Sequence, residues 1–348
     1  MTESCDGALH PVLAELAREA RKAVGPLIGL GGVFLLFCLL APATFRSEYN
    51  LRTMVTQSVV VGIGAMGMTL VMAAGGIDLS AGSVIALATV VTARVLRWDG
   101  APAWAPMPLL AAAAAVGVGT LTGLLNGLVV ARLGIVPFIA TLGTMQVARG
   151  AAKWMAREQS VVAPATALNE LMNVEPDPAW LVVAPGVWAL AGLTVSLAVL
   201  LRLTVFGRYV FALGSNEQTA RLCGVRVALH KTAVYTLCGL LAGVAGVMQF
   251  ANLTVGDPTT ANGMELDIIA AVVIGGGSLS GGEGSALGSL VGALIMLALR
   301  NGCNHIGIPN YVQNVVVGVV IVGAVAADRF RGRFSLPRMP WRRGGSRP

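Results

Sequence analysis

The sequence is dominated by apolar blocks of about twenty residues, the length of α-helix that crosses the hydrocarbon core of a bilayer. Ten such blocks follow one another, several of them short or interrupted by glycine. They cover residues 24–45, 54–75, 82–96, 108–131, 135–151, 180–201, 231–251, 264–277, 284–300 and 311–328. Because backbone polar groups inside lipid must be hydrogen-bonded within their own segment, such blocks predict helices. We therefore expect an all-α polytopic membrane protein with about ten transmembrane helices.

Composition excludes the main alternative classes. Of 348 residues, 55% are hydrophobic and 12% are charged, and the mean hydropathy is +0.76. Soluble domains carry about a quarter charged residues, so this chain lacks the charge to cover a water-facing surface. The net charge of +7 does not indicate nucleic-acid binding, because the basic residues gather in a few loops and at the C-terminus. The five cysteines form no CxxC pair and no metal-ligand spacing, so neither a disulfide nor a metal site is expected.

The distribution of basic residues predicts the orientation. If the N-terminus is cytoplasmic and ten spans follow, 16 of the 24 Lys and Arg residues fall on the cytoplasmic side, as the positive-inside rule requires. Both termini are then cytoplasmic, and the first block acts as a signal anchor. The expected organisation is a cytoplasmic segment 1–23, a transmembrane domain 24–328 with a long cytoplasmic loop 202–230, and a basic cytoplasmic tail 329–348.

Short motifs recur five spans apart, which predicts an inverted internal repeat. Gly-Ile-Asp-Leu-Ser at 76–80 opens the third span and Gly-Met-Glu-Leu-Asp at 263–267 opens the eighth; a competing register pairs 75–82 with 275–282. Glycines also recur every four residues at 119, 123 and 127 and at 284, 288 and 292. Such ladders indicate close helix packing, either within the chain or at a subunit interface or moving seam.

Ionisable residues near the apolar zone are candidates for structural or gating roles. These residues are Asp78, Glu265, Asp267, Arg300 and His305, and the three acidic ones are the candidates for that role. Asp78 could instead cap a helix that begins at Leu79. A proton-coupled carrier is expected to place a carboxylate or histidine in mid-span, and the sequence has none there.

Neutral polar and aromatic side chains suit a pathway for a polyhydroxylated neutral solute, although interhelical hydrogen bonds would explain each of them equally well. The candidates are Gln57, Asn126, Phe138, Thr141, Asn301 and Asn304. No phosphate-binding loop of the GxxxxGK[ST] type and no catalytic constellation is present. We therefore expect no enzymatic activity and no cofactor bound by this chain.

The loop 207–227 contains a short helix with basic shoulders. An Asx cap and an acidic first turn begin it and a glycine ends it. Its candidate contact residues are Gly214, Asn216, Glu217, Ala220, Arg221 and Gly224. Such a helix suits the groove of a partner protein; the alternative is an amphipathic loop lying on the lipid headgroups.

The Glu217…Ala220…Gly224 pattern resembles the coupling ("EAA") loop by which permease subunits of ABC importers dock on their ATPases. Residues 75–87, 126–145, 207–227, 235–247, 263–295 and 301–313 resemble, in the same order, ribose/xylose-type monosaccharide ABC permeases. Gln218-Thr219 stands where that loop is usually alanine-rich, which leaves the docking role intact.

This resemblance implies a ten-helix homodimeric permease in the bacterial cytoplasmic membrane. An extracytoplasmic sugar-binding protein would deliver the solute, and a cytoplasmic ATPase subunit would bind the ATP. Another small solute (a nucleoside, a sugar derivative or a branched-chain amino acid) and an ion-coupled secondary carrier remain as alternatives.

Overall fold

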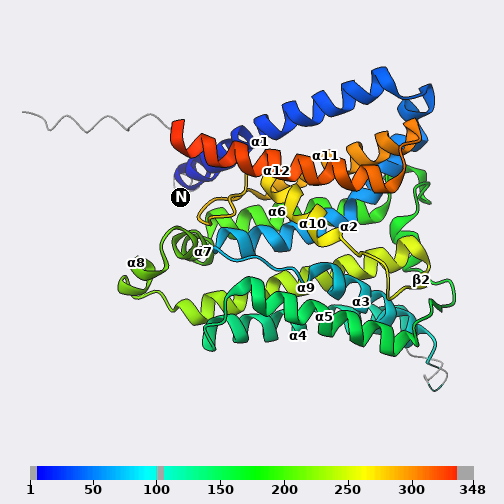
Figure 1. Ribbon diagram of the computed structural model, residues 1–348, viewed down its shortest axis with the longest axis horizontal. Coiled ribbons are helices and arrows are strands. Elements are labelled where there is room, and N and C mark those ends of the chain that lie inside the picture. The colour runs from blue at the N-terminus through cyan, green and yellow to red at the C-terminus, as the bar shows by residue number, and fades with distance from the viewer. Residues whose placement is uncertain (1–5, 99, 101–105, 335–348) are drawn as a thin grey trace, which may run out of the picture.

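The computed structural model describes residues 6–98, 100 and 106–334, which form an elongated bundle of helices that mostly run along its long axis (Figure 1). Its α-helices are α1 (Asp6–Leu40), α2 (Glu48–Ala73), α3 (Ala81–Leu96), α4 (Met107–Arg132), α5 (Pro137–Ala156), α6 (Pro185–Leu203), α7 (Val205–Ser215), α8 (Glu217–Leu222), α9 (Val227–Leu253), α10 (Met264–Ile274), α11 (Ala286–Ile306) and α12 (Asn310–Phe334). Three 3-10 turns lie at Ala43–Arg46, Asn169–Met172 and Ala179–Leu181. Two short strands, β1 (Val161–Val162) and β2 (Val255–Gly256), pair antiparallel.

Each of the ten apolar blocks coincides with one helix, and the boundaries differ most at the start of α1. Helix α1 begins at Asp6, so most of the segment expected to precede the first span is helical. Its Ala-, Glu-, Leu- and Arg-rich sequence consists of strong helix formers, which explains why the helix extends past the apolar block. Helix α12 continues to Phe334, into the expected tail, whose residues 335–348 lie outside the described residues, as does Cys5.

Among the residues that the structure describes, six helices are long and apolar enough to cross a membrane. They are α2, α4, α6, α9, α11 and the Ala23–Leu40 part of α1. Helix α2 is the most buried of these and lies at the centre, where it packs on α6, α9, α10 and α11. The chain is thus an all-α polytopic membrane protein.

The first glycine ladder packs α4 against α9. A side chain at Gly119 would place its Cβ 2.8 Å from the Cα of Gly243, and one at Gly123 would place it 2.9 Å from the Cα of Gly239. At Gly127 the neighbour is the Cα of Thr232, at 2.7 Å. Real Cβ atoms do not approach so closely, so the two backbones touch only because these positions lack side chains. The ladder therefore forms a packing seam within the chain; we call it the α4–α9 seam.

Helices α2 and α10 end in the same backbone turn. Gly75 and Gly276 both have a positive φ, of 82° and 89°. In each case this glycine and its successor donate to carbonyls of the last helical turn at 2.8–2.9 Å. Glycine is required here because this left-handed conformation is costly for residues with a side chain. Both turns then lead through irregular segments into α3 and α11.

Candidate functional site

Helix α8 has the local structure that its sequence predicts. The Asn216 side chain accepts a hydrogen bond from the Thr219 N–H at 2.8 Å, which caps the first turn. After Leu222 the chain reverses at Gly224, whose φ is +82°. The N–H of Gly224 donates to the Arg221 carbonyl at 3.0 Å, and that of Val225 donates to the Ala220 carbonyl at 3.1 Å. A side chain at Gly224 would meet no atom within 4 Å, so this glycine is needed for its backbone conformation rather than for space.

Glu217 connects α8 to α9. Its carboxylate accepts from Lys231 Nζ at 2.6 Å and from Arg221 Nη2 at 3.2 Å. The hydrogen bond from Lys231 in particular, together with the positive charges of Lys231 and Arg221, lowers the pKa of the Glu217 carboxyl below its ordinary value. Lys231 is absent from the residues singled out by the sequence. It lies 14 positions from Glu217, beyond a turn whose direction depends on Gly224.

Ala220 and Arg221, two of the six residues expected to contact a partner, differ in exposure, and Leu222 beside them is exposed too. Ala220 is buried and packs against Leu213 and Val227, so it supports α8 from beneath. Leu222, by contrast, is 89% exposed, and the side chain of Arg221 is 70% exposed. A partner of α8 therefore meets Leu222 and Arg221 rather than Ala220. The sequence alone had predicted that Ala220 contacts the partner directly.

Gly214, at the end of α7, contacts the glycine turn that follows α2 and a second turn, Gly281–Gly282, that precedes α11. A side chain at Gly281 would place its Cβ 2.7 Å from the Gly214 carbonyl oxygen and 2.8 Å from the Cα of Gly75. Beside them, the Gly282 N–H donates to the Ala73 carbonyl at 3.0 Å. Three backbones from distant parts of the chain thus touch directly, and a displacement of α7 must be felt by both turns.

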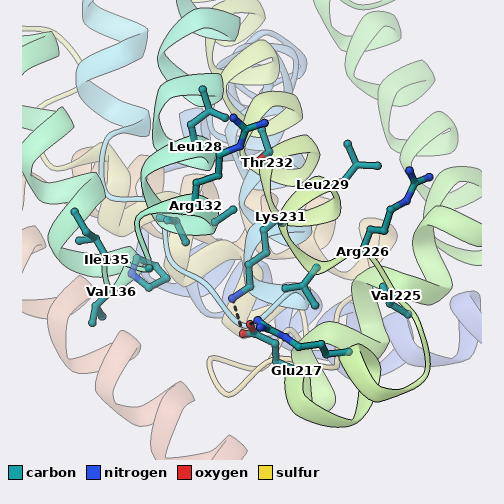
Figure 2. Close-up of a pocket in the computed structure, with 17 residues that line it drawn as sticks. Leu128, Arg132, Ile135, Val136, Glu217, Val225, Arg226, Leu229, Lys231 and Thr232 are labelled. Atoms are coloured by element: carbon teal, nitrogen blue, oxygen red, sulfur yellow. Dashed lines mark hydrogen bonds and ion pairs between the residues drawn. The ribbon is translucent and has the colours of Figure 1, made fainter.

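A groove of about 900 Å³ separates α8 from the end of α4 and the start of α5 (Figure 2). Leu128 and Arg132 of α4 and Thr232 of α9 lie together at its upper end, and the Glu217–Lys231 ion pair lies at its lower end. Because this groove keeps α8 apart from α4 and α5, α8 packs mainly on α7 and α9. Figure 1 shows α8 projecting from one end of the bundle.

Two candidate pathway residues lie together inside the bundle, close to Asp78. Asn126 donates to Ser80 Oγ at 3.0 Å, and Thr141 Oγ1 lies 3.3 Å from the Ile77 carbonyl oxygen. Asp78 is 2% exposed and accepts from both the Oγ and the backbone N–H of Ser80, at 2.6 and 2.8 Å. The expectation that Asp78 caps a helix starting at Leu79 is wrong: α3 begins at Ala81 and Asp78 closes an Asx turn before it.

The other candidates are dispersed. Asn301 exchanges two amide hydrogen bonds of 3.0 Å with Asn50, and Asn304 accepts from Gln313 at 2.7 Å. Gln57 and Phe138 are exposed on the outer surfaces of α2 and α5.

The two acidic residues of α10 differ in their partners. Asp267 pairs with Arg300 of α11 at 2.8 Å. The buried Oε2 of Glu265, within the described residues, has no hydrogen-bond partner.

A family model described as "Branched-chain amino acid transport system / permease component" matches residues 50–325, from the first turn of α2 into α12. The chain belongs to this permease family. This protein is therefore a permease component of a transport system rather than an enzyme.

Three relatives match the permease over most of their length. It is 40% identical over 302 residues to the ribose import permease protein RbsC of Escherichia coli strain K12, covering 87% of this chain and 92% of that protein. It is 37% identical over 308 residues to RbsC of Bacillus subtilis strain 168, covering 88% and 93%. It is 32% identical over 334 residues to the L-arabinose ABC transporter permease protein AraH of Azospirillum brasilense, covering 94% of each chain. No solved structure gives a significant match.

Proposed function

We propose that this permease is the membrane subunit of an ATP-binding-cassette importer that carries a monosaccharide similar to ribose or xylose. The observation that carries the proposal is α8, a capped helix at one end of the bundle that presents Leu222 and Arg221 to a partner. The names of the relatives, which are import permeases for ribose and L-arabinose, support the class of solute.

In this proposal a cytoplasmic ATPase subunit binds the ATP and docks on α8, and an extracytoplasmic binding protein delivers the sugar. The permease itself needs no cofactor. Movement of α8 passes to α7 and α9 through the Glu217–Lys231 pair and the buried Ala220. It then reaches the turn after α2 and the Gly281–Gly282 turn before α11 through the backbone contact at Gly214.

The proposed arrangement in the bacterial inner membrane has ten spans, with both termini and α8 in the cytoplasm. The packing of the helices supports an inverted repeat that relates α2–α5 to α9–α12. Helix α3 packs on α4, α5 and α9, and α10 correspondingly packs on α11, α12 and α2. This pairing matches the register in which the third span corresponds to the eighth. Two copies of the permease would complete the transporter.

The first test is co-purification from membranes with the ATP-binding protein encoded nearest to this gene, comparing the wild type with Gly224→Val. A β-branched residue strongly resists the positive φ at this position, so the variant should insert normally but lose the complex and ATP-driven uptake. Cys223→Ser, a neighbouring change at an exposed position, is the matched control. Normal uptake by Gly224→Val would contradict the coupling role.

The solute class is tested by uptake of a panel of labelled D-ribose, D-xylose, L-arabinose, a nucleoside and leucine into proteoliposomes that contain the full complex. Uptake of one or more of the sugars supports the proposal, and uptake of leucine or the nucleoside alone replaces it with another solute. If the wild-type chain purifies alone and moves solute under an ion gradient, the ABC assignment is wrong.

A further inference from the structure

A small polar cavity lies between α3, α5 and the segment that joins β2 to α10, away from the groove beside α8. Its volume is about 170 Å³, roughly five to six times the ~30 Å³ that a water molecule occupies in the liquid. Helix α8 lies at one end of the bundle, whereas α3, α5 and β2 converge towards the other (Figure 1). The cavity is therefore well separated from the coupling helix.

The cavity has a predominantly polar lining. Three of its eight lining residues, Arg149, Lys153 and Glu265, are charged, and Met145 is its one apolar member. Across the whole sequence only 12% of residues are charged. In a membrane protein, polar and charged side chains that gather in a cavity mark a pathway for a polar solute.

Glu265 lines the cavity and carries a buried, unpartnered acceptor beside it. Its Oε2 is fully buried and has no hydrogen-bond partner among the described residues. It approaches the first turn of α3 because Gly82 has no side chain; a Cβ at Gly82 would also lie 2.7 Å from the Ala261 carbonyl oxygen. A buried acceptor without a partner costs about 1–3 kcal/mol in general, so a rotation of the Glu265 carboxylate that brings this oxygen to a solute hydroxyl in the cavity would be favourable.

Arg149 fixes the opposite side of the cavity. Its Nη1 donates to the carbonyls of Pro258 at 3.0 Å and Thr260 at 2.8 Å, which attaches the segment before α10 to α5. Gln146 and Asn262 lie on the cavity wall with exposed amides, each of which both donates and accepts. The cavity thus combines a carboxylate, a guanidinium and two amides around a space of small-molecule size.

We propose that this cavity is a subsite for the transported solute, with Glu265, Gln146 and Asn262 as the residues that bind it. Its ligand class is a small neutral polyol, because each hydroxyl of a polyol donates one hydrogen bond and accepts others. An apolar amino acid would need a hydrophobic wall, which Met145 alone does not provide. This inference rests on the proposed function and assigns Glu265 a contact with solute rather than a purely structural or gating role.

The test measures uptake of the sugar that the wild type carries best in the panel, using the complete complex in proteoliposomes. Glu265→Gln should reduce the maximal rate about tenfold, and Gln146→Ala and Asn262→Ala about fivefold each, because each loses a hydrogen bond to the solute. Matched controls are the neighbouring exposed residues Leu266→Ala and Val147→Ala, which should stay within about twofold of the wild type.

The dependence of the uptake rate on the concentration of solute-loaded binding protein distinguishes a role of these residues in the subsite from a role in docking of that protein. Because the cavity acts after the solute has been delivered, the maximal uptake rate of the variants should fall. The concentration of loaded binding protein that gives half-maximal uptake should stay constant. A rise in that concentration alone, or uptake equal to that of the controls, would overturn the subsite and leave the importer intact. Failure of the wild type to transport any panel sugar would overturn the proposed function itself. The amides of Gln146 and Asn262 are exposed, so their variants decide the question even if Glu265→Gln fails to assemble.

Discussion

Gly123 in the α4–α9 seam and Gly224 after α8 are both indispensable in this fold, for different physical reasons. A side chain at Gly123 would collide with the backbone of Gly239, although the helical conformation itself would accept it. A side chain at Gly224 would meet no atom within 4 Å, but the φ of +82° resists it. One glycine is required by a neighbour and the other by its own backbone.

Under the proposed function, the difference separates a rigid region from a region that transmits movement. In the seam, many backbone atoms of α4 and α9 touch, so the two helices must move together. Helix α8 has only six residues, packs mainly on α7 and α9, and borders an open groove. The seam is therefore suited to hold a framework, and α8 to be displaced relative to it.

The largest effect on the stability of the permease is expected from a substitution in the α4–α9 seam. Gly123→Ala should destabilise the permease by about 1–3 kcal/mol, because its Cβ forces two backbones apart. Gly117→Ala, on the same helix with no atom within 4 Å, should instead be neutral or stabilising by up to about 1 kcal/mol. Thermal unfolding of the detergent-solubilised proteins measures both. Equal stability of the two variants would contradict the distinction between them.

At Gly224 the effect should be local. Gly224→Ala should cost about 1–2 kcal/mol, paid within the turn, and should reduce ATP-driven uptake more than it lowers the unfolding temperature. Gly224→Asn should restore much of the uptake, since asparagine tolerates this conformation better than other residues with a side chain. If alanine and asparagine behave alike, backbone conformation is not what Gly224 supplies.

A smaller effect is expected from the ion pair between α8 and α9. Lys231→Met removes the 2.6 Å hydrogen bond to Glu217 and should cost up to about 1 kcal/mol, because the pair is partly exposed. Helix α8 should become more mobile, as reported by a spin label on Cys223 after the other four cysteines are replaced. Arg221→Met, which removes the longer and more exposed contact, should change the mobility less.

The smallest effect is the pH dependence of the same contact. The pKa of Glu217 in the folded protein lies below its ordinary value of 4.5, so the ion pair contributes fully above about pH 4.5. Its contribution is lost as the pH falls through the lower, folded-state pKa. The Cys223 label should therefore gain mobility in the wild type only as the pH falls through this lowered pKa, and Glu217→Gln should lack this transition. An identical transition in both proteins would exclude Glu217 as its source.

The sequence by itself determined the features that depend on neighbours a few positions away. Apolar blocks of the right length predicted the helices that the structure contains, because helical hydrogen bonds connect residues four positions apart. Asn216 and Gly224 likewise identified the beginning and end of α8, since a cap joins groups within one turn. Family resemblance rested on the same local patterns and was confirmed by the match over residues 50–325.

The tertiary structure decided which side chains meet across the bundle. The α4–α9 seam joins Gly127 to Thr232, and the cavity joins Gln146 to Glu265, across more than a hundred residues in each case. Such contacts depend on how whole helices rotate and cross, which no local spacing records. For the same reason the burial of Ala220 and the exposure of Leu222 became evident only once α7, α8 and α9 were placed together.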